Sequence, residues 1–167
     1  MNAVEMQKTM AVGMGELCTT RDPLVVLAAY GLGSCIGVSV YDPVARVGGL
    51  AHVMLPCSRE VSSQKLSYRF ADVAVPSLLE RVQQLGAMRK RLICKIAGGA
   101  HMLALAGNSD GFKIGERNAE AVAEALGQCG IKPLATEVGG TRGRTMRLFV
   151  ENGRVFVKTV GQMDLEL

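Results

Sequence analysis

The chain has 167 residues, of which 49% are hydrophobic and 20% charged, and its formal net charge is +4. The composition fits one globular domain with an aliphatic core, and the chain is too short for two full domains. No apolar stretch approaches the roughly 20 residues that a membrane span needs, and residues 1–14 lack the apolar segment of a signal peptide. We therefore expect a cytoplasmic protein with no membrane insertion.

The first half of the chain predicts strands joined by tight turns and then one helix. Short apolar or alternating runs bounded by Pro, Gly and Asp indicate the strands, and a one-sided apolar pattern indicates the helix. Gly86 suits the C-terminal cap of that helix, and Pro76 favours a later start of its regular part. In chain order we expect a weakly signalled strand within 2–14, strands over 24–30, 36–41 and 46–55, a polar loop over 57–67 and a helix over 72–85.

The second half predicts one further helix among strands. Asn118 is a candidate N-cap for this helix, and Asn152-Gly153 is the strongest hairpin signal in the chain. In chain order we expect a strand over 92–97, a helix over 118–126, a strand over 131–138, and a hairpin formed by 146–150 and 154–157. These elements predict an α+β fold in which one domain, residues 1–167, has a mostly antiparallel sheet core with helices packed outside.

The sequence GLGSCIG, residues 31–37, carries the first chemical signal. Its G-x-G-x-x-x-G spacing and the strand pattern after it do not fit a dinucleotide-binding loop, and no P-loop lysine is present. A glycine-rich turn can instead expose a nucleophile, and the N–H of Cys35 could donate to an oxyanion. Taken alone, a cysteine in a glycine-rich turn is more often structural than catalytic.

His52 adds to this signal. It lies in the expected strand over 46–55, which is the hairpin partner of the strand that follows Cys35. A cysteine and a histidine on neighbouring strands can form a nucleophile and its base. A satisfied histidine of the core or of a sheet edge remains the alternative. His101, the other histidine, lies in a glycine-rich turn and is interpreted as a loop residue.

The remaining patterns indicate surface or core. The five cysteines are widely spaced without a C-x-x-C pair, so neither a disulfide framework nor a structural zinc site is expected. Cys18, Cys57, Cys94 and Cys129 are interpreted as structural. The basic cluster within 142–147 is interpreted as solvated surface, with docking of acidic helices of a partner as the alternative. Nucleic-acid binding is disfavoured because aromatic residues do not alternate with the basic ones.

Longer motifs resemble one family. The segment Gly31 to Pro56 (GLGSCIGVSVYDPVARVGGLAHVMLP), followed by KIAGGAHM, IGERNAE and GGTRGR, is similar to the CheD family of chemoreceptor glutamine deamidases over roughly residues 12–158. The resemblance implies a layered α/β sandwich, no cofactor and no metal. It also implies chemotaxis receptors as substrates through their cytoplasmic helical region, and a CheC-type phosphatase as a further partner.

The resemblance also implies a site. The family nucleophile falls on Cys35 and the family histidine on His52, with Gly33 and Ser34 in the turn that would hold the oxyanion. The family threonine that orients the histidine falls on Ala29, which has no hydrogen-bonding side chain. Two hypotheses follow: a protein-glutamine glutaminase that works through a thioester, or a weakly active or inactive binding module that regulates receptors or a CheC-type phosphatase.

Overall fold

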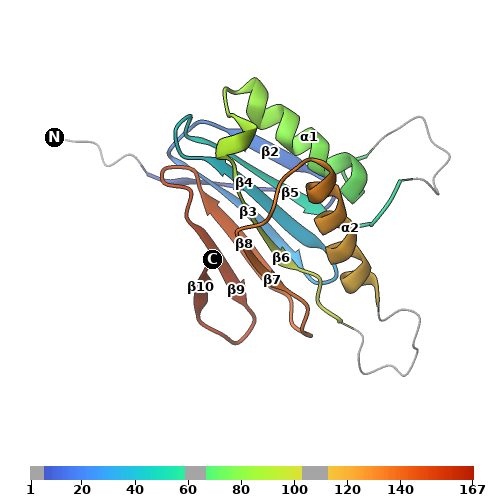
Figure 1. The fold of residues 1–167 in the computed structure, drawn as a ribbon. Coiled ribbons are helices and arrows are strands. Elements are labelled where there is room, and N and C mark those ends of the chain that lie inside the picture. The colour runs from blue at the N-terminus through green and yellow to red at the C-terminus, as the bar shows by residue number, and fades with distance from the viewer. Residues whose placement is uncertain (1–5, 59–66, 103–112) are drawn as a thin grey trace.

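Two five-stranded sheets pack face to face, and both α-helices cover the outer face of one of them (Figure 1). The computed structural model describes residues 6–58, 67–102 and 113–167. The first sheet consists of β1 (Lys8–Ala11), β3 (Val25–Leu32), β8 (Arg144–Phe149), β9 (Val155–Thr159) and β10 (Asp164–Glu166), in that order. The second consists of β2 (Leu17–Thr20), β5 (Val47–Val53), β4 (Ile36–Asp42), β6 (Ile93–Gly98) and β7 (Ala135–Val138). The helices are α1 (Ala71–Gln84), α2 (Ile114–Gln128) and the short 3-10 helix η1 (Arg89–Arg91).

Most strand pairs are antiparallel, as predicted. The two parallel pairs join β1 to β3 and β6 to β7, and the other six pairs are antiparallel. The hairpin β4–β5 and the hairpin β8–β9 around Asn152-Gly153 are both confirmed. The α+β class and the layered arrangement with helices outside are therefore confirmed.

Two apolar layers result from this stacking. One lies between the helices and the second sheet, and it includes Ile36, Val38 and Leu78. The other lies between the two sheets and includes Leu27 and Leu148. Because side chains alternate along a strand, each strand of the second sheet sends every second residue into each layer. The register of β4 and β5 therefore decides which side chains face the inter-sheet layer.

Several predicted boundaries need correction. Helix α2 begins at Ile114, so Asn118 lies in its second turn and is not the N-cap. Helix α1 begins at Ala71, so Pro76, which was expected to favour a later start, lies inside the helix. The last predicted single strand is shorter than expected, since β7 begins only at Ala135, after Gly130 with φ of 72° and Pro133.

Two short edge strands were not predicted. Strand β2 pairs with β5 over four residues, and β10 pairs with β9 over three. Their sequences, LCTT and DLE, are too short to show a period. The weak signal within 2–14 is confirmed by β1. Most of the polar loop expected over 57–67 lies outside the described residues.

Candidate active site

Cys35 ends the glycine-rich turn between β3 and β4. Its side chain is buried, with 8% of the residue exposed, and it belongs to the apolar layer between the sheets. Gly33 and Ser34, which precede it, are half-buried. Gly31 needs its flexibility here because its φ is 66°. The turn therefore places a thiol at the end of the inter-sheet layer.

His52 lies on β5 and faces the same layer. Gly37 of β4 pairs with His52, and Cys35 precedes Gly37 by two residues, so all three point to one face of the sheet. This diagonal relation corresponds to about 7–8 Å between Cα atoms, which long side chains can bridge. The structure thus brings the two sequence-predicted residues into the same layer.

Ala29 reaches this layer from the opposite sheet. It is fully buried on β3 and pairs with Met146 of β8. Its methyl group offers no hydrogen bond to His52. The position that the family threonine would occupy is therefore an apolar part of the core.

The backbone supplies the bond that Ala29 cannot. His52 Nδ1 lies 3.1 Å from the carbonyl oxygen of Val12, just beyond β1. A carbonyl oxygen only accepts hydrogen bonds, so Nδ1 must carry the proton and Nε2 must carry the free lone pair. Nε2 is buried and has no hydrogen-bond partner among the described residues. His52 is therefore held as the tautomer whose Nε2 can accept a proton.

Burial keeps both groups neutral in the resting protein. Burial raises the pKa of the Cys35 thiol. Burial also lowers the pKa of His52, against a smaller opposing effect of the Val12 hydrogen bond and of Glu16. Desolvation disfavours the charged form of each group. At neutral pH we therefore describe the pair as thiol and imidazole rather than as a preformed ion pair.

Sequence analysis missed the role of Asn118. This residue is fully buried on α2, and its Nδ2 donates to the carbonyl oxygens of Ser34 and Met54, each at 2.8 Å. It thereby connects the Cys35 turn to the segment after His52. The available signal was a polar residue on the buried stripe of the helix, beside Gly115 and Val122.

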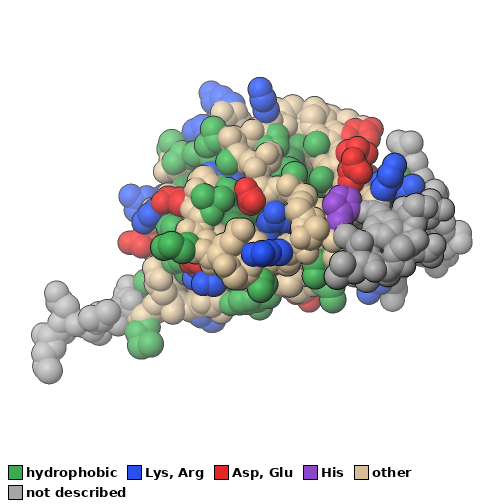
Figure 2. All heavy atoms as spheres, turned by 90° about the horizontal axis from the view of Figure 1, so that it is seen from below, with side chains coloured by type: hydrophobic (Ala, Val, Ile, Leu, Met, Phe, Trp, Pro, Cys, Tyr) green, Lys and Arg blue, Asp and Glu red, His purple; other side chains and the backbone are tan. Residues whose placement is uncertain are grey.

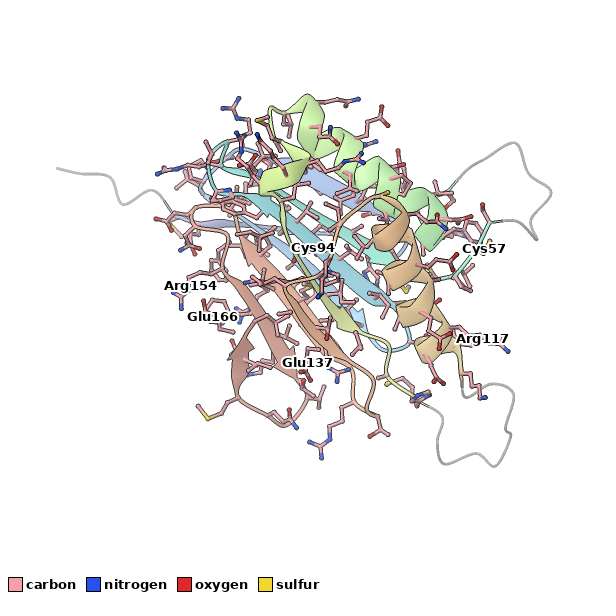
Figure 3. The ribbon with its side chains drawn as sticks, viewed as in Figure 1. Cys57, Cys94, Arg117, Glu137, Arg154 and Glu166 are labelled. Atoms are coloured by element: carbon pink, nitrogen blue, oxygen red, sulfur yellow. The ribbon has the colours of Figure 1, made fainter. Side chains whose placement is uncertain are left out.

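Of the other candidate residues, Cys94 and Cys57 lie apart from this layer, whereas His101 follows Gly99 and Ala100, whose N–H groups donate to the Cys35 turn. His101 is half-buried, and its backbone N–H donates to Gly140. Cys94 lies in the layer beneath the helices, and burial raises its pKa to about 12. Cys57 lies near α1 and α2, where its sulfur is 3.5 Å from Asp72, so these two cysteines occupy different regions (Figure 3). The pocket beside Cys57 is lined by Arg117 and does not include Cys35 or His52.

The basic cluster is only partly surface. Arg144 was expected to be exposed, but it is 7% exposed and donates to the carbonyls of Gly98 and Gly139. Arg147 is half-buried and pairs with Asp164. On the face drawn in Figure 2, Lys and Arg side chains stand among apolar and acidic ones rather than in one continuous basic patch.

None of the helices in the described part of the chain is long and apolar enough to cross a membrane. Within residues 6–58, 67–102 and 113–167, no three His, Cys, Asp or Glu side chains are grouped so that they could hold a metal ion.

Known proteins match this chain over most of its length. The family model described as CheD chemotactic sensory transduction matches residues 54–159. A protein from Symbiobacterium thermophilum named "Probable chemoreceptor glutamine deamidase CheD" is 48% identical over 162 residues, which cover 94% of this chain and 96% of that protein. The chain belongs to the CheD family. The resemblance inferred from the motifs is thereby confirmed.

Further CheD proteins match over similar lengths. Proteins of the same name from Caldanaerobacter subterraneus subsp. tengcongensis and Clostridium novyi are 45% and 41% identical, and the matches cover 92% and 90% of this chain and 94% and 92% of theirs. Among solved structures, the Bacillus licheniformis hypothetical protein YfiH has a TM-score of 0.43 and 13% identity, and the match covers 83% of this chain and 60% of that one. This last likeness is too low to indicate a shared fold.

Proposed function

We propose that this CheD-family chain is a chemoreceptor glutamine deamidase with Cys35 as its nucleophile and His52 as its base. The name of the relatives, at 41–48% identity over nine tenths of the chain, supports the reaction and the substrate. The hydrogen bond between His52 Nδ1 and the Val12 carbonyl is the observation that carries the assignment of the base. It selects the tautomer that a general base for Cys35 requires.

The first half of the reaction forms a thioester. Nε2 of His52 takes the proton of Cys35 as the sulfur attacks the carbonyl carbon of a receptor glutamine side chain, and the carbonyl electron pair moves onto oxygen. The backbone N–H of Cys35, in the turn with Gly33 and Ser34, donates to this oxyanion. The imidazolium then protonates the amide nitrogen, the C–N bond breaks and ammonia leaves.

The second half hydrolyses the thioester. His52 takes a proton from water, whose oxygen attacks the thioester carbonyl. The C–S bond breaks as the His52 imidazolium returns its proton to the sulfur of Cys35, and the receptor side chain leaves as glutamic acid, whose proton passes to the released ammonia in solution. No electron is transferred to or from an external group, so the sequence of steps consumes water alone.

The neutral resting pair fits this order of events. Both charges are unfavourable in the buried layer, so a permanent thiolate would be costly there. Substrate binding supplies the carbonyl that takes up the negative charge as the proton moves to His52. The thiol is therefore activated at the moment of attack.

The partners and the location belong to the same proposal. The substrates are methyl-accepting chemotaxis receptors, modified in the helical region that lies in the cytoplasm, so the protein acts there. A CheC-type phosphatase is a candidate regulatory partner. The names of the relatives support the receptors as substrates, and the CheC-type partner rests on the motif resemblance alone.

Ala29 favours a second candidate, a CheD-like binding module that has lost its activity. Without the threonine, a histidine with no other partner would be free to turn to an unproductive orientation. The Val12 carbonyl removes the need for that threonine, because it already holds Nδ1. We therefore rank the enzyme above the binding module.

Incubation with the cytoplasmic fragment of a chemotaxis receptor tests the proposal. The wild-type protein should convert specific glutamines to glutamates, detected as a mass gain on mapped peptides, and Cys35→Ala should abolish the conversion. Cys57→Ala is the matched control and should retain it. A folded wild-type protein that binds the fragment but leaves every glutamine unchanged would favour the binding module.

A further inference from the structure

Asn118 is a polar side chain in an apolar setting. It is fully buried on α2, where its neighbours on the buried face of the helix include Gly115 and Val122. Burying an amide costs free energy unless it is hydrogen-bonded. Its two N–H groups are used, and its Oδ1 has no partner among the described residues.

The two bonds of Asn118 end on both sides of the candidate active site. One acceptor is the carbonyl of Ser34, the residue before Cys35, and the other is the carbonyl of Met54, two residues after His52. Both acceptors are carbonyl oxygens, which fixes the amide with its NH2 group toward them. One side chain of α2 thus connects the turn of the nucleophile to the strand of the base.

Asn118 completes a row of anchored carbonyls in the turn. The Gly33 carbonyl accepts from Ala100 N–H at 2.7 Å, and the Cys35 carbonyl accepts from Gly99 N–H at 2.9 Å. Asn118 holds the carbonyl between them. Every carbonyl from 33 to 35 therefore has a defined direction.

These anchors also fix the N–H groups of the turn. The described residues contain no cis peptide bond, so each N–H points opposite to the carbonyl of the preceding residue. The N–H of Ser34 must point away from Ala100, and the N–H of Cys35 must point away from Asn118. Neither N–H has a hydrogen-bond acceptor among the described residues. Two donors are thereby left available next to the thiol.

We propose that Asn118 is a positioning residue that aims the N–H of Cys35 at the oxyanion of the deamidation reaction. The inference rests on the proposed function and adds a residue to it. Asn118 touches no reacting atom, because its contact is with the Ser34 carbonyl on the other side of the peptide plane. Without Asn118 that buried carbonyl loses its donor, and the peptide can rotate and carry the Cys35 N–H out of line.

The proposal predicts a separation between two reactions of the same thiol. Deamidation builds negative charge on a carbonyl oxygen and needs the oxyanion donors. Alkylation by iodoacetamide joins sulfur to a saturated carbon and releases iodide, so it forms no oxyanion. Losing one oxyanion donor typically lowers kcat by about 10²–10³-fold. A purely structural role would change both reactions together.

The test compares Asn118→Ala with Val122→Ala. Val122 is fully buried one turn further along the same helix, so its truncation controls for general weakening of α2. For each variant, deamidation of a receptor fragment gives kcat and KM, and peptide mapping gives the pH profile of Cys35 alkylation. Asn118→Asp, which keeps the shape and when protonated can donate to only one carbonyl, receives the same measurements in case the alanine variant fails to fold.

The expected result is a loss of kcat of about ten- to several-hundred-fold in the Asn118 variant, with KM and the alkylation profile nearly unchanged. Val122→Ala should keep kcat within a few-fold. The proposal is overturned if a folded Asn118 variant keeps its kcat, if kcat and alkylation fall together, or if Val122→Ala loses as much kcat. A wild-type protein without deamidase activity would instead refute the proposed function and this inference with it.

Discussion

His52 combines burial with one specific backbone hydrogen bond, and its chemistry depends on both. Sequence reasoning identified the residue from its place beside Cys35. It could not identify Val12 as the partner, because that contact joins positions forty residues apart through the pairing of β1 with β3 and the stacking of the two sheets. The pattern of a sequence predicts strands but not which backbone atoms meet across two sheets.

The pKa of His52 makes stability depend on pH. Burial lowers the pKa of His52 below the ordinary value of about 6.5, so the unfolded chain binds this proton before the native protein does. The contribution of His52 to the free energy of unfolding should therefore be fully present above pH 6.5, and it should be lost as the pH drops below that value. Urea unfolding between pH 7 and pH 5 measures the slope, and His52→Gln should flatten it. An unchanged slope in that variant would assign the effect to other groups.

Ala29→Thr tests whether the missing threonine matters. Nδ1 of His52 is already bound to Val12, so the new hydroxyl should change kcat by no more than several-fold. Placing two extra heavy atoms in this filled layer should lower the free energy of unfolding by about 1–3 kcal/mol. Receptor deamidation kinetics and a thermal melt check the two effects. Robust turnover gained from an undetectable level would mean that the natural protein is impaired.

At the level of elements, β4 and β6 hold the Cys35 turn in place. Sequence reasoning predicted both strands and the glycines after β6, but not their contact with the turn. Gly98 ends β6 with a φ of 119°, and a Cβ at this position would lie 2.1 Å from the Cys35 carbonyl oxygen. This close approach explains why residue 98 is glycine, which the sequence alone does not reveal.

Gly98→Ala should therefore damage the active site. The φ value is unfavourable for alanine, and the new methyl group must displace the Cys35 carbonyl. We expect kcat to fall at least tenfold, as oxyanion donors move out of line, measured with a receptor fragment. Gly86→Ala is the control, since its φ is 100° but its Cβ would meet no atom within 4 Å. It should lower stability while leaving kcat unchanged, and an equal loss of kcat there would contradict the argument.

A partly buried ion pair joins the end of β4 to η1, far from the Cys35 turn. Asp42 is fully buried at the end of β4, and the Arg91 guanidinium of η1 donates to it at 2.8–3.0 Å. Burial alone would raise the pKa of Asp42, but hydrogen bonds from Arg91 and from the N–H groups of Met88, Ala45 and Val44 hold it well below its usual range. The sequence pattern alone does not predict this contact, because Arg91 and Asp42 lie 49 positions apart in the chain.

Breaking this pair should destabilise the whole protein. Asp42→Ala leaves Arg91 and three backbone N–H groups without their acceptor, and we expect the free energy of unfolding to fall by about 3–5 kcal/mol in urea titrations. Glu166→Ala, which breaks the exposed pair with Arg154, is the control and should have a much smaller effect (Figure 3). Equal effects of the two substitutions would contradict the importance assigned to Asp42.

The sequence predicted the fold class better than it predicted how the strands are arranged in the two sheets. Strong periodic segments gave α1, β3, β4, β5 and the β8–β9 hairpin. The division into two sheets could not be predicted from the sequence. It depends on β3 pairing with β8, far along the chain, while the next strand, β4, lies in the other sheet. The proposed nucleophile and base were predicted through motif resemblance, whereas Asn118 was wrongly predicted to be a helix cap.

A trapped thioester would test the central claim most directly. A receptor fragment mixed with the wild-type protein and quenched in acid during turnover should yield, after proteolysis, a receptor peptide joined to the Cys35 peptide with the loss of ammonia. The adduct should decay into glutamate-containing receptor peptide when quenching is delayed, and it should be absent in Cys35→Ala. Conversion of receptor glutamines by a Cys35→Ala protein, or an adduct mapped to another cysteine, would contradict the account.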